Sequence, residues 1–122
     1  MRDGRQPTVA VVDDDEAVRD SLRFLLETAG FAVRTFDSPA AFFSAPMGGL
    51  VCLLVDQHMP YLTGLDLLTR LRERGCCLVV ALMTGSPSPE LMRRAQELGA
   101  AIVMEKPLQE DVLMRFLDAV TA

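Results

Sequence analysis

Short apolar runs alternate with longer amphipathic segments five times along this chain, and this alternation restricts its fold more than any other feature. Apolar runs rich in Val, Leu and Ile are typical of strands that are buried on both faces of a parallel sheet. The segments between them repeat apolar residues at helical spacing. The pattern therefore predicts an α/β domain with a doubly wound, five-stranded parallel sheet between two layers of helices.

Capping residues help to set the expected elements. Ser38 and Ser88 each precede a proline, which is typical of a helix N-cap followed by its first residue, and Gly30 is placed to end the first helix. The predicted strands are Thr8 to Val12, Ala32 to Phe36, Val51 to Val55, Leu78 to Met83 and Ala101 to Met104. The predicted helices are Glu16 to Thr28, Pro39 to Ser44, Gly64 to Glu73, Pro89 to Leu98 and Gln109 to Val120.

Length and composition exclude several classes of protein. The 122 residues predict a single domain over 1–122, with its core at about 8–120. A net charge of -5 argues against direct binding of nucleic acid by this domain. No apolar run approaches the ~20 residues of a membrane span, and Met1 to Pro7 lacks the apolar stretch of a signal peptide. We therefore expect a cytoplasmic protein that does not contact a membrane.

Polar residues follow the predicted strands at the edge where the functional groups of such sheets collect. The candidates are Asp13 and Asp14 after the first strand, Asp56 after the third, Thr84 after the fourth and Lys106 after the fifth. Asp37 follows the second strand, and we interpret it as a cap of the next helix.

The acidic run Asp13 to Asp15 predicts a cation site. Like charges packed at a strand end resist ionisation unless something positive lies beside them. Hard carboxylate oxygens suit Mg²⁺, which proteins usually hold with one or two carboxylates and water. The alternative is a solvated loop that caps the helix beginning near Glu16, and for Asp15 we prefer this capping role.

Four motifs occur in order at the ends of predicted strands: V-V-D-D-D-E at 11–16, L-V-D-Q-H-M-P at 54–60, M-T-G at 83–85 and E-K-P at 105–107. In register with five β/α units, they resemble the response regulator receiver domains of bacterial two-component signalling, from about Thr8 to Ala119. The resemblance implies a flavodoxin-like sheet with strand order 2-1-3-4-5 and a cis bond before Pro107.

The resemblance also implies a phosphorelay function. Asp56 would accept a phosphoryl group from a sensor histidine kinase, a histidine phosphotransfer protein or a small phosphodonor. Mg²⁺ would be held by Asp13, Asp14, Asp56 and the backbone carbonyl of His58, while Thr84 and Lys106 would contact the phosphoryl group. Such a domain catalyses only its own phosphotransfer and dephosphorylation, and positioning and charge neutralisation carry most of that catalysis.

Two departures from the family pattern concern the switch. Val103 stands where the family usually has an aromatic residue. With no ring to move, the space left by a shift of Thr84 would be filled by Val103 or Met104, so Thr84, Val103 and Met104 are the expected switch residues. The loop from Gly85 to Pro89 carries two prolines, which predict a stiff connection. A homodimer, if formed, would use the fourth helix, fifth strand and fifth helix. The side chain of His58 is interpreted as an exposed bystander.

Three alternatives remain to be weighed. A haloacid dehalogenase-type phosphohydrolase needs an Asp two residues after its nucleophile, where His58 stands. A flavin-binding electron carrier needs a phosphate loop after strand one, where the acidic run would repel phosphate. A degenerate receiver would act as a phosphorylation-independent docking module, but it would normally lack one of the five site residues. The sequence does not indicate the kinase, the signal, or whether the receiver stands alone or belongs to a longer regulator.

Overall fold

The computed structural model of the protein describes residues 6–122. Residues 1–5, on which the argument against a signal peptide partly rests, lie outside the described part. Among the described helices, none is both long enough and apolar enough to cross a bilayer.

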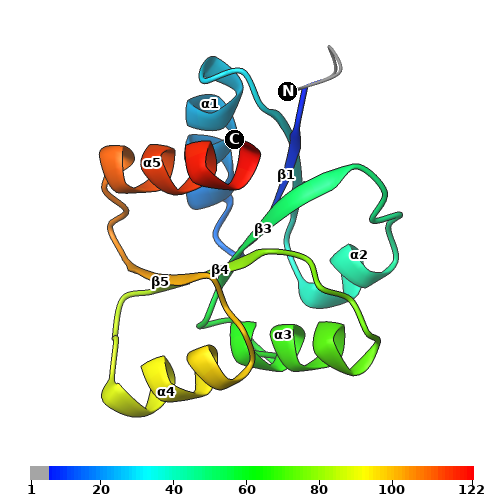
Figure 1. Cartoon of the computed structure of the whole chain (residues 1–122), viewed down its shortest axis with the longest axis vertical. Helices are drawn as coiled ribbons and strands as arrows, with labels where there is room; N and C mark the ends of the chain where they lie inside the picture. Colours follow the sequence, from blue (N-terminus) through cyan, green and yellow to red (C-terminus); the bar gives the residue numbers. More distant parts are fainter. Residues whose placement is uncertain (1–5) are drawn as a thin grey trace.

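The described chain forms five strands and five helices in strict alternation. Their bounds are β1 Thr8–Val12, α1 Glu16–Thr28, β2 Ala32–Phe36, α2 Pro39–Phe43, β3 Leu50–Asp56, α3 Gly64–Glu73, β4 Val80–Thr84, α4 Pro89–Glu97, β5 Ile102–Glu105 and α5 Glu110–Thr121. All neighbouring strands are parallel, in the order β2-β1-β3-β4-β5. Helices α1 and α5 cover one face of the sheet, and α2, α3 and α4 cover the other (Figure 1). The predicted fold class and strand order are confirmed.

The observed element bounds differ from the predicted ones by at most two residues, and β1, α1, β2 and α3 have the predicted bounds. The largest difference is at β4, which begins at Val80 rather than at Leu78. The carbonyl of Leu78 accepts a hydrogen bond from the Arg72 guanidinium at 3.1 Å, so this apolar residue lies before the paired part of the strand. β3 extends to Asp56, because Asp56 still pairs with Met83 in the register of the sheet.

Helix caps are mostly where the sequence indicates. Asp15 is the N-cap of α1 and accepts a hydrogen bond from the backbone N–H of Ala17 at 2.9 Å. Ser38 and Ser88 cap α2 and α4 as predicted. The capping role expected for Asp37 is wrong, because the hydroxyl of Ser38 already accepts the backbone N–H inside the first turn of α2.

The central strands are buried on both faces, and their side chains alternate between two apolar layers. In β3, Leu53 and Val55 pack with α2, α3 and α4, whereas Cys52 and Leu54 pack with α1 and α5. This alternation follows from the two-residue period of a strand. Every strand end that carries a candidate site residue is therefore positioned by packing on both sides.

Gly64 brings the start of α3 against the end of β3. A Cβ atom at this position would lie 2.6 Å from Cδ2 of Leu82 and 2.8 Å from the carbonyl oxygen of Asp56. The backbone N–H of Gly64 donates to the carbonyl of Gln57 at 3.2 Å, and the Gln57 side chain accepts the N–H of Leu65 at 2.9 Å. The segment after Asp56 is thus held at both of its ends.

Arg72 links the ends of two helices. Its guanidinium donates hydrogen bonds to the carbonyls of Leu98 at 2.9 Å and Gly99 at 3.1 Å, just after α4. It also donates to the carbonyls of Cys76 at 2.8 Å and Leu78 at 3.1 Å, between α3 and β4. Helix-end carbonyls lack partners within their own helix, so this side chain fixes the C-terminal end of α4 to α3.

Candidate functional site

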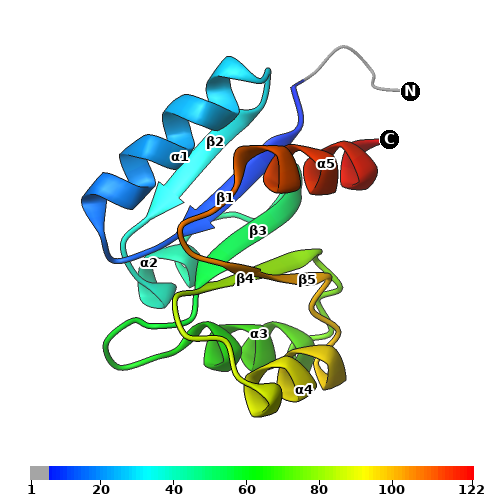
Figure 2. The same ribbon diagram turned by 90° about the vertical axis from the view of Figure 1, so that its left-hand side faces the viewer.

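The carboxyl ends of the parallel strands lie at one edge of the sheet, where the chain leaves β3 and β4 toward α3 and α4 (Figure 2). The predicted site residues Asp13, Asp56, Thr84 and Lys106 meet at this edge, linked in pairs by the contacts given below. Asp13, Asp56 and Thr84 are buried, and the side chain of Lys106 is 25% exposed. Four residues from separate segments of the chain therefore form one partly enclosed polar site.

Three carboxylates are clustered in this site. One oxygen from each of Asp13, Asp14 and Asp56 lies within 4.8 Å of the others. Both oxygens of Asp13 have protein partners, since Oδ1 accepts the backbone N–H of Asp15 at 3.0 Å and Oδ2 contacts Lys106. Asp14 is exposed. Asp13 is therefore held within the fold, whereas Asp14 is exposed to solvent.

Lys106 neutralises part of this negative charge. Its Nζ lies 2.9 Å from Oδ2 of Asp13 and 3.2 Å from Oδ1 of Asp56. Burial alone would lower the pKa of Lys106, but its hydrogen bonds to the two carboxylates and their charges outweigh burial and raise it. The pairing of Lys106 with Asp13 was not predicted from the sequence.

Asp56 is destabilised as an anion in the absence of a further cation. Burial, followed by the charge of Asp13, raises its pKa above the ordinary value, although Lys106 and the backbone N–H of His58 act in the opposite direction. The single positive charge of Lys106 therefore balances only part of the negative charge of the three carboxylates. This donor set fits a divalent cation, because hard oxygen ligands with an excess of negative charge are what Mg²⁺ prefers.

Thr84 and His58 form a contact that sequence reasoning missed. The buried Oγ1 of Thr84 accepts the backbone N–H of Ser86 at 3.0 Å and lies 3.1 Å from Nε2 of His58. The histidine is exposed, as expected, but its ring is not a bystander. The available signal was its position, as the single histidine of the chain, two residues after Asp56.

Of the expected switch residues, Thr84 ends β4, and Val103 and Met104 lie on opposite faces of β5. Val103 is half-buried and packs against the apolar layer formed with α3 and α4, while Met104 is buried in the layer formed with α1 and α5. The backbone N–H of Lys106 donates to the carbonyl of Thr84 at 2.7 Å, which joins the ends of β4 and β5. The Lys106–Pro107 peptide bond is cis, as the family resemblance implied.

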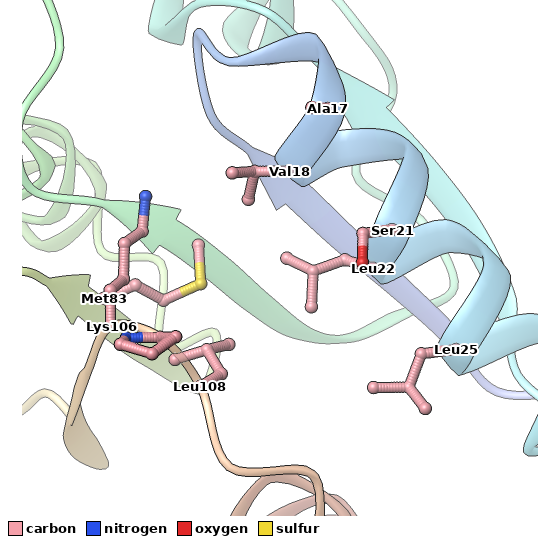
Figure 3. Close-up of a pocket in the computed structure, with 9 residues that line it drawn as sticks. Ala17, Val18, Ser21, Leu22, Leu25, Met83, Lys106 and Leu108 are labelled. Atoms are coloured by element: carbon pink, nitrogen blue, oxygen red, sulfur yellow. The ribbon is translucent and has the colours of Figure 1, made fainter.

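An apolar groove of about 580 Å³ adjoins the site. Val18, Leu22 and Leu25 of α1 point toward Met83 and Leu108 across it (Figure 3). Lys106 also lines the groove, so one residue is shared between this groove and the carboxylate cluster.

Comparisons with known proteins agree with this arrangement. The sequence matches the response regulator receiver domain family over residues 9–118. It is 39% identical over 112 residues to the transcriptional regulatory protein FixJ of Bradyrhizobium diazoefficiens, covering 91% of this chain and 55% of that protein. It is 43% identical over 107 residues to FixJ of Azorhizobium caulinodans, covering 87% of this chain and 51% of that protein. The chain therefore spans about half the length of these curated relatives.

Solved structures give the same result. The structure titled FixJ-N superposes with a TM-score of 0.84 at 32% identity, covering 95% of this chain and 94% of that one. A chemotaxis protein CheY4 of Vibrio cholerae superposes with a TM-score of 0.86 at 24% identity, covering 95% and 99% of the two chains, and this likeness concerns the fold alone. On the match of the family to nearly the whole chain, the protein belongs to the response regulator receiver domains of two-component signalling.

Proposed function

We propose that this receiver domain accepts a phosphoryl group on Asp56 from a phosphohistidine in a sensor kinase or phosphotransfer protein, or from a small phosphodonor. The observation that carries the proposal is the buried carboxylate of Asp56, 3.2 Å from the Lys106 ammonium and within 4.8 Å of the Asp13 and Asp14 carboxylates. In the reaction an oxygen of Asp56 forms a bond to phosphorus, and the bond from phosphorus to the donor nitrogen or oxygen breaks.

The residues around Asp56 suit this transfer. Charge accumulates on the peripheral phosphoryl oxygens in the transition state, so a fixed cation beside them lowers the barrier. Lys106 is that cation in the proposed mechanism, and its pairing with Asp13 keeps it oriented. The hydroxyl of Thr84, at the end of the neighbouring strand, would donate a hydrogen bond to a phosphoryl oxygen afterwards.

Mg²⁺ is the proposed cofactor. Asp14, Asp56 and the backbone carbonyl of His58 would bind it directly, whereas Asp13 would act through water because protein groups occupy both of its oxygens. When bound, the cation supplies the positive charge that neutralises the carboxylates and the phosphoryl oxygens. The raised pKa of Asp56 supports this assignment, because an added cation would favour the ionised carboxylate that reacts.

The groove beside α1 is the proposed docking place of the phosphodonor. A donor histidine must reach Asp56, and Lys106 borders both the groove and the carboxylate cluster. The groove is lined mostly by aliphatic side chains such as Val18 and Leu22. It would therefore take the apolar face of an amphipathic helix of the donor protein, beside its phosphohistidine.

The proposed output surface comprises α4, β5 and α5. Thr84 is joined to the loop before α4 through the N–H of Ser86, so movement of its hydroxyl would be passed to that helix. We therefore expect Thr84→Ala to uncouple this surface from phosphorylation. Val103 has few rotamers and should change little in the switch, so we expect Val103→Ala to preserve the coupling. The same surface would serve a homodimer.

The proposed output of this domain is control of transcription. The FixJ relatives are named transcriptional regulatory proteins, and we infer that this domain controls such an output while not contacting nucleic acid itself. A single domain over 1–122, with its core at 8–120, and a cytoplasmic location complete the proposal. A docking module independent of phosphorylation is not favoured, because all five site residues are present.

Incubation with radiolabelled acetyl phosphate and Mg²⁺ tests the proposal. Wild-type protein should incorporate label and Asp56→Asn should not. Asp37→Asn is the matched control, because Asp37 also follows a strand but is exposed and belongs to no carboxylate cluster in the described chain. Equal labelling of wild type and Asp56→Asn would refute the assignment of the acceptor.

A further inference from the structure

The hydroxyl of Thr84 has a specific set of neighbours in the described structure. The side chain is fully buried. Its Oγ1 accepts a hydrogen bond from the backbone N–H of Ser86 at 3.0 Å, and the second contact is with Nε2 of His58 at 3.1 Å. The two contacts come from the β4–α4 connection and from the β3–α3 connection, which leave the same side of the sheet (Figure 2).

The direction of the second hydrogen bond follows from the capacity of a hydroxyl. A threonine hydroxyl has one proton to donate and two lone pairs to accept with. If Nε2 donated, both contacts would use lone pairs and the buried proton of Thr84 would lack a partner, which is costly away from water. If the proton is donated to a neutral His58, every group is paired, so we assign Thr84 as the donor and Nε2 as the acceptor.

We propose that the side chain of His58 is a positioning residue that holds the Thr84 hydroxyl in its resting orientation and so opposes the switch. This inference rests on the proposed function, in which Thr84 donates the same proton to a phosphoryl oxygen on Asp56. A hydroxyl has only one proton, so the bond to His58 must break before the bond to the phosphoryl group forms.

The location of His58 suits this restraining role. The β3–α3 connection that carries it is fixed by the close packing of Gly64 and by the hydrogen bonds of Gln57. The histidine is exposed, so water can pair with Nε2 once Thr84 leaves, and the opposition amounts to one ordinary hydrogen bond. The net value of such a bond corresponds to an equilibrium shift of roughly 2- to 12-fold.

A titration with beryllofluoride in excess Mg²⁺ measures this opposition, because beryllofluoride mimics a phosphoryl group on a carboxylate. His58→Phe keeps an aromatic ring but removes the acceptor, and it should bind beryllofluoride roughly 2- to 12-fold more tightly than wild type. His58→Gln retains a polar acceptor at about the same distance along the side chain, so it should restore the wild-type affinity.

A double-mutant cycle separates the proposed route from other effects of the ring. In a Thr84→Val background the hydroxyl is absent, so His58→Phe should no longer change beryllofluoride affinity. A merely structural or steric role of His58 would change affinity equally in both backgrounds, and that result would overturn the inference. It would also be overturned if His58→Phe left the affinity of the otherwise wild-type protein unchanged.

Two controls keep this inference distinct from the proposed function. A wild-type protein that binds no beryllofluoride would refute the proposed function itself. The resting contact is tested without any phosphate mimic by the ¹⁵N resonance of His58 Nε2 at a pH where the ring is neutral. Thr84→Val should move this resonance toward that of an unpaired nitrogen, and an unchanged resonance would refute the contact.

Discussion

Asp13 and Asp14 are neighbours in sequence, yet replacing each with asparagine should change the stability of the metal-free protein in opposite directions. Both carboxylates belong to the same cluster with Asp56. They differ in their protein partners, because Asp13 is buried and bonded through both oxygens, whereas Asp14 is exposed. The pair therefore separates the effect of repulsion from the effect of hydrogen bonding within one site.

For Asp13→Asn the loss of partners dominates. The amide can still accept the N–H of Asp15, but it loses the charged hydrogen bond to Lys106, and such bonds contribute about 1.5–3 kcal/mol. Relief of repulsion with Asp56 recovers only part of this, because the Lys106 ammonium contacts both carboxylates, at 2.9 Å and 3.2 Å, and already offsets much of their repulsion. We therefore expect a net loss in the free energy of unfolding that is smaller than the roughly 1.5–3 kcal/mol of the lost bond.

For Asp14→Asn only repulsion is removed. Its carboxylate lies within 4.8 Å of two others, and the exposed position keeps the effective dielectric high. A Coulomb estimate in a water-like medium gives about 0.9 kcal/mol for each of the two carboxylates, and attraction to Lys106 cancels part of it, so the gain is about 1 kcal/mol; for a domain of this size this raises the melting temperature by about 3–5 °C. Asparagine has nearly the same shape as aspartate, so packing should not contribute.

Thermal melts in EDTA test this contrast. Asp14→Asn should melt above wild type and Asp13→Asn below it. Mg²⁺ at ten times its Kd should then stabilise wild type by about 1.4 kcal/mol and both variants less. If both substitutions raised the melting temperature in EDTA by similar amounts, repulsion would dominate at Asp13 as well, and the stabilising role given to its pair with Lys106 would be wrong.

Three further predictions concern other groups. Because the pKa of Asp56 is raised in the folded state, its contribution to stability is complete below the ordinary pKa of 3.8 and is lost as pH rises through the folded-state pKa. Asp56→Asn should therefore raise the melting temperature in EDTA at pH 7, and this gain should shrink toward pH 4. A gain that grew toward pH 4 would contradict this reasoning. Arg72→Met should lower the free energy of unfolding by about 2–3 kcal/mol in urea titrations, because four hydrogen bonds to carbonyls are lost. The control Arg93→Met breaks an exposed pair with Glu97 and should change the free energy of unfolding by less than about 0.5 kcal/mol. Burial raises the pKa of the Cys52 thiol to about 12, so iodoacetamide at pH 8 should modify the exposed Cys77 in the native protein, and mass spectrometry should find Cys52 modified only after unfolding.

The order and type of the elements could be predicted from the sequence because they depend on periodicity. Strands buried on both faces need uninterrupted apolar runs, and helices at the sheet faces need apolar residues at helical spacing. The positions of Asp13, Asp56, Thr84 and Lys106 at one edge follow from the parallel order of the strands, so their convergence was also predictable.

Side-chain pairing within that edge could not be predicted in the same way. Nothing local in the sequence indicates that Lys106 lies closer to Asp13 than to Asp56. The partner of Lys106 depends on how far the ends of β1, β3 and β5 extend relative to one another at the edge of the sheet. The contact between His58 and Thr84 joins residues 26 positions apart, and so does that of Arg72 with Leu98. Such contacts have no periodic pattern, and only the folded backbone determines them.

The attachment of α4 by Arg72 has a geometric consequence for signalling. With its C-terminal end fixed near Leu98, α4 can respond to its preceding loop mainly by rotation about that end. The helix has 9 residues and is about 14 Å long, so a tilt of roughly 10° would move its first turn by about 2 Å and its last turn hardly at all. A partner that distinguishes the phosphorylated from the unphosphorylated form should therefore contact α4 near Pro89 and the exposed Met92, at the N-terminal end of the helix, which moves most.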